Sequence, residues 1–152
     1  MTGPLVRRLV AEAFATLGIR VLVEAINPID MPGFLINTPE HLDALLRAVD
    51  HPNLAAQYDL YHMARQGLDV AAGIRLLAGR IGHVQFADVP GRGAPGTGEL
   101  AFPALLGALR DSGYSGWLGA QAAKAFAMAC EQGMTDRDDS AMLEFIRMAD
   151  KT

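Results

Sequence analysis

The chain has 152 residues, of which 51% are hydrophobic and 20% are charged, a balance typical of one globular domain rather than of a disordered segment. Its net charge of −4 and the lack of any Lys/Arg cluster argue against nucleic-acid and acidic-membrane partners, so a small molecule is the expected partner. A lone cysteine, Cys130, excludes an internal disulfide, and Arg7, Arg8 and Glu12 interrupt any signal-peptide core, so we expect a cytoplasmic protein without a membrane span.

The first elements predicted along the chain are a helix and a strand. Residues 6–17 carry apolar side chains at helical spacing, and Gly18 follows them as the residue type that best tolerates a left-handed C-terminal cap. Residues 19–25 are a short apolar run rich in β-branched residues, which indicates a buried strand with the polar Glu24 near its end.

The same alternation continues to residue 121. Thr38 followed by Pro39 predicts a helix start, because a hydroxyl N-cap precedes a proline that needs no N–H there. Further helices are predicted at residues 68–80 and from Pro103 to Gly113, and further strands at residues 53–59, 81–88 and 115–120. This order favours an α/β fold with a parallel sheet and crossover helices.

Polar residues lie at the ends of the four predicted strands: Glu24, Asp59, Gln85 and Gln121. The C-terminal ends of parallel strands meet at one edge of a sheet, so these oxygens should converge on one point. Oxygen ligands of this kind suit a hard divalent cation such as Mg²⁺ or Mn²⁺. A single acidic residue at a strand end more often caps a loop, so the prediction depends on the whole set. His83, two residues before Gln85, should face the same side and is expected to be a core or supporting residue.

Four segments resemble, in this order and spacing, the hydroxypyruvate isomerase family and its close relatives the 2-oxotetronate isomerases. They are VEAINPIDMPGF, QYDLYHM, IGHVQFADVPGRGAPGTGE and GYSGWLGA, and the similarity covers about residues 4–120. It implies a xylose isomerase-like TIM barrel of which this chain has the second half, about four βα units with parallel strands. We therefore expect a half TIM barrel over residues 1–121 and a helical C-terminal tail over residues 122–152.

The resemblance also implies roles for individual residues. Glu24 would be both a metal ligand and the catalytic acid/base, Asp59 and Gln85 would be further ligands of Mg²⁺ or Mn²⁺, and His62 and Arg92 would bind the substrate's oxygen atoms. The implied reaction is the interconversion of hydroxypyruvate and 2-hydroxy-3-oxopropanoate, an aldose–ketose type isomerisation that moves a proton through an enediolate. The alternative substrate is the four-carbon 2-oxotetronate.

Gln121 departs from the family pattern, which has a Glu at the end of the last strand. An amide oxygen can bind a metal, but it cannot exchange a proton at neutral pH, so the second acid/base would be missing. This predicts impaired catalysis, and it keeps open a non-catalytic half barrel that binds a metal or a partner chain. Beyond Gln121 the chain faintly resembles the C-terminal helices of β-hydroxyacid dehydrogenases, with two helices divided at Gly133.

A half barrel has two free sheet edges and one open face, so we expect a homo-oligomer. The side chains predicted to face the open interior are Val21, Val23, Ala56, Tyr58 and Val84.

Overall fold

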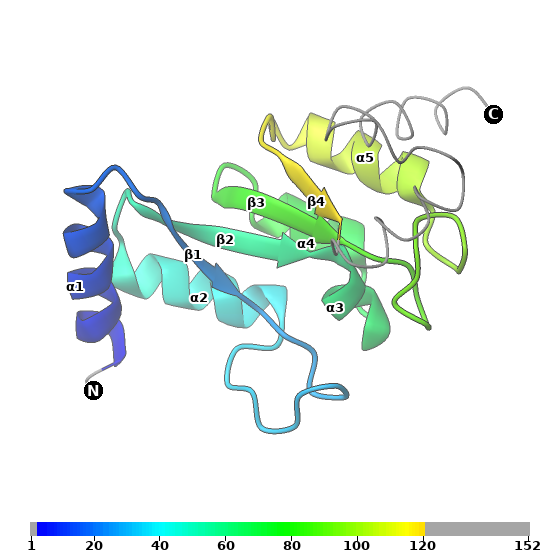
Figure 1. Ribbon diagram of the computed structural model, residues 1–152, viewed down its shortest axis with the longest axis horizontal. Coiled ribbons are helices and arrows are strands. Elements are labelled where there is room, and N and C mark those ends of the chain that lie inside the picture. The colour runs from blue at the N-terminus through cyan, green and yellow to red at the C-terminus, as the bar shows by residue number, and fades with distance from the viewer. Residues whose placement is uncertain (1–2, 121–152) are drawn as a thin grey trace, which may run out of the picture.

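The computed structural model describes residues 3–120, which form a four-stranded parallel sheet with helices packed on one face (Figure 1). The strands lie in chain order across the sheet: β1 (Val21–Glu24), β2 (Leu54–Asp59), β3 (Ile81–Phe86) and β4 (Leu118–Ala120). The helices are α1 (Gly3–Ala15), α2 (Pro39–Val49), α3 (Leu60–Arg65), α4 (Val70–Leu76) and α5 (Phe102–Asp111). The predicted α/β fold with parallel strands and crossover helices is confirmed, and it has the form of a partial barrel.

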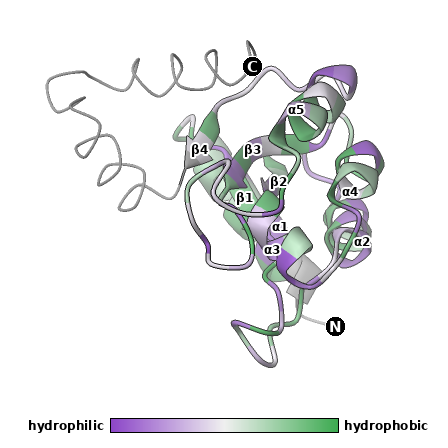
Figure 2. Ribbon diagram, turned by 90° about the vertical axis from the view of Figure 1, so that its right-hand side faces the viewer, coloured by the Kyte–Doolittle hydropathy of each residue, from purple (hydrophilic) through white to green (hydrophobic). Residues whose placement is uncertain are grey.

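The hydrophobic core lies between the sheet and α2, α4 and α5, which follow one another along the same face (Figure 2). Leu42, Ile74 and Val84 are fully buried there, and full burial of such a side chain stabilises the fold by about 1.5–3 kcal/mol. The Tyr58 hydroxyl donates a hydrogen bond of 2.9 Å to the Val70 carbonyl, which fastens β2 to the start of α4.

The faces of the sheet differ from the prediction. Val21, Val23, Ala56, Tyr58 and Val84 pack into the core beneath the helices, so the expectation that they face the barrel interior is wrong. Successive side chains of a strand point to opposite faces of the sheet. The polar residues at the strand ends lie on the face away from the helices, so their apolar neighbours lie on the helix side. The open face therefore carries the alternate residues, Glu24, Gln57, His83 and Gln85 among them.

Local signals predicted the start of α2 and the left-handed Gly18 after α1, but they misplaced both ends of α4 and missed one helix. The Thr38 hydroxyl accepts a hydrogen bond from the His41 N–H at 3.2 Å, as expected for an N-cap, and Gly18 has a φ of +70°. The helix expected over residues 68–80 spans only Val70–Leu76. The short α3 was not predicted, because its six residues are too few for helical periodicity to be visible.

The α1 helix packs against α2 by only part of its surface. Asn53 ties it to the start of β2 by donating hydrogen bonds to the carbonyls of Ala11 and Ile19, at 3.0 and 2.8 Å. Ala11 is fully buried, whereas Leu9 is 56% exposed and Phe14 is 41% exposed. The apolar side of this helix is thus in large part uncovered within residues 3–120.

Two predictions fall outside the described residues, namely the position of Gln121 and the helical tail over residues 122–152. Within residues 3–120, no helix has the length and apolar character needed to cross a membrane.

Candidate active site

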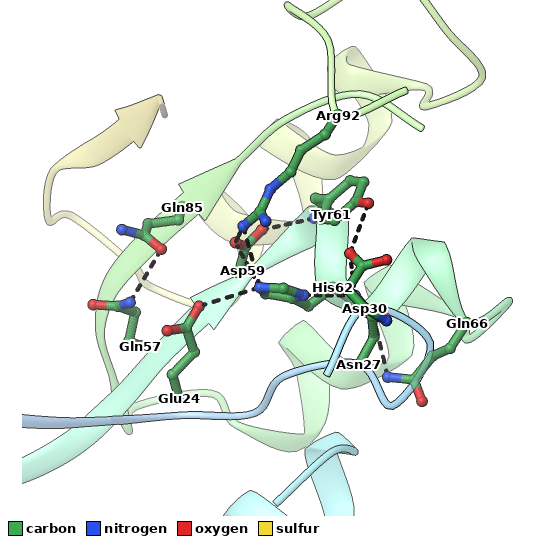
Figure 3. A network of polar contacts seen from close by, with 10 residues as sticks. All are labelled: Glu24, Asn27, Asp30, Gln57, Asp59, Tyr61, His62, Gln66, Gln85 and Arg92. Carbon is green, nitrogen blue, oxygen red and sulfur yellow. Dashed lines mark hydrogen bonds and ion pairs between the residues drawn. The ribbon is translucent and has the colours of Figure 1, made fainter. Parts of the chain in front are cut away.

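The strand ends bring Glu24, Asp59 and Gln85 together at one edge of the sheet (Figure 3). Glu24 ends β1, Asp59 ends β2 and Gln85 lies one residue before the end of β3. His62 Nε2 lies 3.9 Å from Glu24 Oε1 and 3.7 Å from Asp59 Oδ2. These groups adjoin a cavity of about 470 Å³, whose lining residues are Glu24, Ile26, Asp30, Met31, Gln57, His62, Gln85 and Arg92.

Asp59 is positioned by the junction between β2 and α3. Its Oδ1 atom accepts a hydrogen bond of 2.9 Å from the Tyr61 N–H, so the carboxylate is the N-cap of α3. Its Oδ2 atom faces His62 and lies 3.8 Å from Arg92 Nη2. The residue is only 2% exposed. This geometry leaves one buried carboxylate oxygen directed at the site.

Glu24 and Asp59 lie close together in the site, and this environment disfavours the ionised form of each carboxyl group. Burial raises the pKa of Glu24, and the neighbouring negative charge of Asp59 raises it further. Burial likewise raises the pKa of Asp59, against the lowering influence of His62 and Arg92. Ligand atoms of Glu24, Asp59 and His62 all lie within 4.8 Å of one another. Converging carboxylates whose charges repel each other fit a divalent cation, which would relieve that repulsion.

Gln85 lines the cavity, although its amide is already engaged. Its Oε1 atom accepts a hydrogen bond of 3.0 Å from Gln57 Nε2. As a metal ligand, Gln85 would have to share or give up this bond. Gln57 was not predicted as a site residue, yet the alternation of side chains along β2 places it on the same face as Asp59.

Arg92 reaches the site from the loop after β3, thirty residues beyond His62 in the chain. Its guanidinium lies 4.7 Å from the centre of the Tyr61 ring, and its Nη2 atom is 3.3 Å from His62 Nε2. The backbone at Arg92 has a φ of +54°, an uncommon conformation for a residue with a side chain.

The buried Asp88 carboxylate holds this loop in shape. It is 1% exposed and accepts hydrogen bonds of 2.9 to 3.0 Å from four backbone N–H groups, those of Val89, Gly96, Gly98 and Leu100. Charge-assisted bonds of this kind are stronger than neutral ones. The loop therefore presents Arg92 from a well-anchored frame rather than from a loose segment.

Sequence reasoning also missed Asn27 and Asp30, in the loop after β1. The Asp30 Oδ2 atom accepts hydrogen bonds from the Tyr61 hydroxyl at 2.8 Å and from Asn27 Nδ2 at 3.1 Å. These two bonds, that of Asn27 first, lower the pKa of Asp30. Both residues lie within the VEAINPIDMPGF segment. That segment was the signal that could have identified them.

Comparison with known proteins identifies relatives of this chain. The chain is 40% identical over 111 residues to a 2-oxo-tetronate isomerase of Cupriavidus necator, covering 73% of this chain and 43% of that protein. It is also 40% identical over 103 residues to a hydroxypyruvate isomerase of Escherichia coli K12, covering 68% and 40% of the two chains. The chain thus spans about two fifths of the length of these relatives.

A solved structure described as an AP endonuclease, family 2, from Brucella melitensis superposes with a TM-score of 0.71 at 40% identity, covering 75% of this chain and 44% of that one. The family model of the xylose isomerase-like TIM barrel matches residues 6–131, a range that includes all four strands and the whole carboxylate site. On this match the chain belongs to the xylose isomerase-like TIM barrel family, and its four parallel strands form a partial barrel.

Proposed function

We propose that the protein is an isomerase of small oxo acids that interconverts hydroxypyruvate and 2-hydroxy-3-oxopropanoate. One observation carries the proposal: the carboxylates of Glu24 and Asp59 converge with His62 and Arg92 beside the cavity. The names of the relatives in Cupriavidus necator and Escherichia coli support the reaction class. Because both are equally similar to this chain, 2-oxo-tetronate is the second candidate substrate.

The residues fit a divalent metal cofactor, Mg²⁺ or Mn²⁺. Glu24 and Asp59 would hold it through ionised carboxylates, and Gln85 and Gln121 would contribute amide oxygens. A bound divalent ion supplies positive charge that stabilises negative charge developing on the substrate's oxygen atoms.

Proton transfer and substrate binding can be assigned to different side chains. In the forward direction a proton leaves C3 of hydroxypyruvate and a proton is added at C2, with the enediolate between the two steps. Glu24 would take the first proton, because its carboxylate lines the cavity in which the substrate would lie. His62 would donate a hydrogen bond to a substrate oxygen, and the Arg92 guanidinium would pair with the substrate's carboxylate.

The deciding experiment restores the carboxylate that the chain lacks. Gln121→Glu should raise the rate of hydroxypyruvate isomerisation in the presence of Mg²⁺ or Mn²⁺, by about 10²–10⁴-fold if only this acid/base is missing. Glu24→Gln in the same background is the control and should abolish the gain. A Gln121→Glu variant that binds the metal without turning over either oxo acid would contradict the isomerase proposal and favour a non-catalytic metal-binding half barrel.

A further inference from the structure

The amide of Asn27 has a fixed orientation in the structure. Its Oδ1 atom accepts hydrogen bonds from the backbone N–H groups of Ile29 and Asp30, at 3.1 and 2.8 Å. Backbone N–H groups can only donate, so the oxygen must lie on that side and the amino group on the other. Asn27 is fully buried, which leaves no water-facing alternative for this side chain.

The amino group of Asn27 determines which nitrogen of His62 carries the proton. Asn27 Nδ2 lies 2.7 Å from His62 Nδ1, and an amide nitrogen can only donate. His62 Nδ1 must therefore accept, and the proton of the neutral imidazole is on Nε2. Nε2 is the atom that faces Glu24 and Asp59.

We propose that Asn27 is a positioning residue that holds His62 as the Nε2–H tautomer, so that His62 donates a hydrogen bond into the site instead of binding the metal. A protonated Nε2 has no lone pair to offer a cation. The Asp59 oxygen nearest to it, at 3.7 Å, is beyond hydrogen-bond distance, so the donor remains available to a ligand.

Arg92 supplies a second donor at the same place. Its Nη2 atom is 3.3 Å from His62 Nε2, and its Nε atom is buried without a hydrogen-bond partner within residues 3–120. Guanidinium and amide nitrogens both only donate, so Arg92 at 3.3 Å and Asn27 at 2.7 Å compete for the one acceptor nitrogen of a neutral His62. The shorter contact is the one from the buried Asn27 amide, whose orientation is fixed, and it assigns the lone pair to Nδ1. Nε2–H and Arg92 Nη2 are then two neighbouring donors, which a single oxygen placed between them would satisfy. The identification of that oxygen as part of an oxo-acid substrate rests on the proposed function, whereas the tautomer of His62 does not.

A second Asn–His pair, which is exposed to solvent whereas Asn27 and His62 are buried, has the opposite arrangement. Asn37 Nδ2 donates to the Phe34 carbonyl at 3.2 Å, so its Oδ1 atom is the one that lies 3.1 Å from His41 Nδ1. An oxygen acceptor there requires a proton on Nδ1 of His41. The two histidines should therefore carry their protons on different nitrogens in the same molecule.

The test is a two-bond ¹H–¹⁵N correlation spectrum of the 152-residue chain with labelled histidine, recorded at mildly alkaline pH. His62 should show a protonated Nε2 and a bare Nδ1, and His41 the reverse. Added Mg²⁺ should leave the His62 pattern unchanged. A protonated Nδ1 on His62, an averaged signal from both tautomers, or loss of the Nε2 proton with Mg²⁺ would each overturn the proposal.

Variants assign the effect to Asn27. Asn27→Asp replaces the donor by an oxygen acceptor, so Nδ1 of His62 should gain a proton, whereas Asn37→Asp should leave His62 as it is. If Asn27→Asp does not fold, Asn27→Ala should give a mixture of His62 tautomers. A bare Nδ1 on His62 in the Asp variant, or a pure Nε2–H pattern in the Ala variant, would show that Asn27 does not set the tautomer. Neither measurement requires turnover, so an inactive protein would count against the proposed function alone.

Discussion

The two carboxylate oxygens of Asp59 have different roles. One oxygen caps α3 through Tyr61 N–H, while the other faces the site next to His62. We predict that Asp59→Asn weakens Mn²⁺ binding more than Gln85→Ala, because an ionised carboxylate neutralises charge on the cation and an amide supplies only a dipole. Calorimetric titration with Mn²⁺ checks this ranking. Equal losses of affinity in the two variants would contradict it.

Two of the acidic residues near the cavity, Glu24 and Asp30, should affect the pH dependence of stability in opposite directions. Burial raises the pKa of Glu24 above its ordinary value of 4.5, so the folded state holds this proton more tightly than the unfolded chain does. Without added metal, the contribution of Glu24 to the free energy of unfolding should be full below pH 4.5 and fall as pH rises through the raised pKa. Glu24→Gln should remove this fall, so the variant gains stability relative to the unmodified chain as pH rises.

Asp30 is the counterpart with the opposite sign. Hydrogen bonds from Asn27 and Tyr61 lower its pKa below the ordinary value of 3.8, so it should stabilise the fold above pH 3.8 and lose that effect as pH falls through the lowered pKa. Asp30→Asn should therefore lose stability at the higher pH values. Urea unfolding of both variants over a pH series checks the two signs, and parallel pH profiles for the two variants would contradict them.

At the scale of the elements, the packing around a helix glycine decides whether its replacement by alanine stabilises or destabilises the fold. Gly73 lies in α4 where a Cβ atom would collide with the Tyr58 hydroxyl and lie 2.8 Å from Pro39 Cγ. Gly107 lies in α5 with no atom within 4 Å of the same position. Alanine favours a helix over glycine by about 0.5–1 kcal/mol, whereas overpacking costs about 1–3 kcal/mol.

We therefore predict opposite outcomes for the same substitution in the two helices. Gly73→Ala should lower the free energy of unfolding by about 1 kcal/mol or more, because α4 must move away from β2. Gly107→Ala should raise it by about 0.5–1 kcal/mol. Urea unfolding curves measure both values. A stabilised Gly73→Ala variant would mean that α4 moves at little cost.

At the scale of the whole molecule, the described part of the chain leaves apolar surface uncovered. The sheet has helices on one face only, and both β1 and β4 are edges within residues 3–120 (Figure 2). On α1, the side chains of Leu9 and Phe14 are 56% and 41% exposed. Exposed apolar surface next to a free parallel edge favours association.

We predict that the 152-residue chain forms a homo-oligomer through this surface. Leu9→Glu should shift the sedimentation coefficient towards that of a monomer, because a charge would be buried in the contact. Leu35→Glu is the control, since Leu35 is 85% exposed and lies in the loop between β1 and α2, which Figure 1 shows apart from α1. A monomer for the unmodified chain at the same concentrations would contradict the prediction.

Local chemistry in the sequence was sufficient to predict much of the fold. The Thr38–Pro39 helix start, the left-handed Gly18 and the alternation of strands and helices all depend on neighbouring residues, so they can be read along the chain. The convergence of Glu24, Asp59 and Gln85 also follows from the sequence, because parallel strands end at one edge. The family resemblance added His62 and Arg92, and the structure places both beside these residues.

Only the tertiary structure decided how these residues act on one another. It showed that Val23 and Tyr58 belong to the helix side of the sheet, that α1 keeps apolar side chains exposed, and that Asn27 approaches His62 to 2.7 Å across 35 positions of the chain. Burial, pKa shifts and tautomers depend on what lies within a few ångströms in space. No local pattern contains that information, because the distance between two side chains is set by the packing of every element between them.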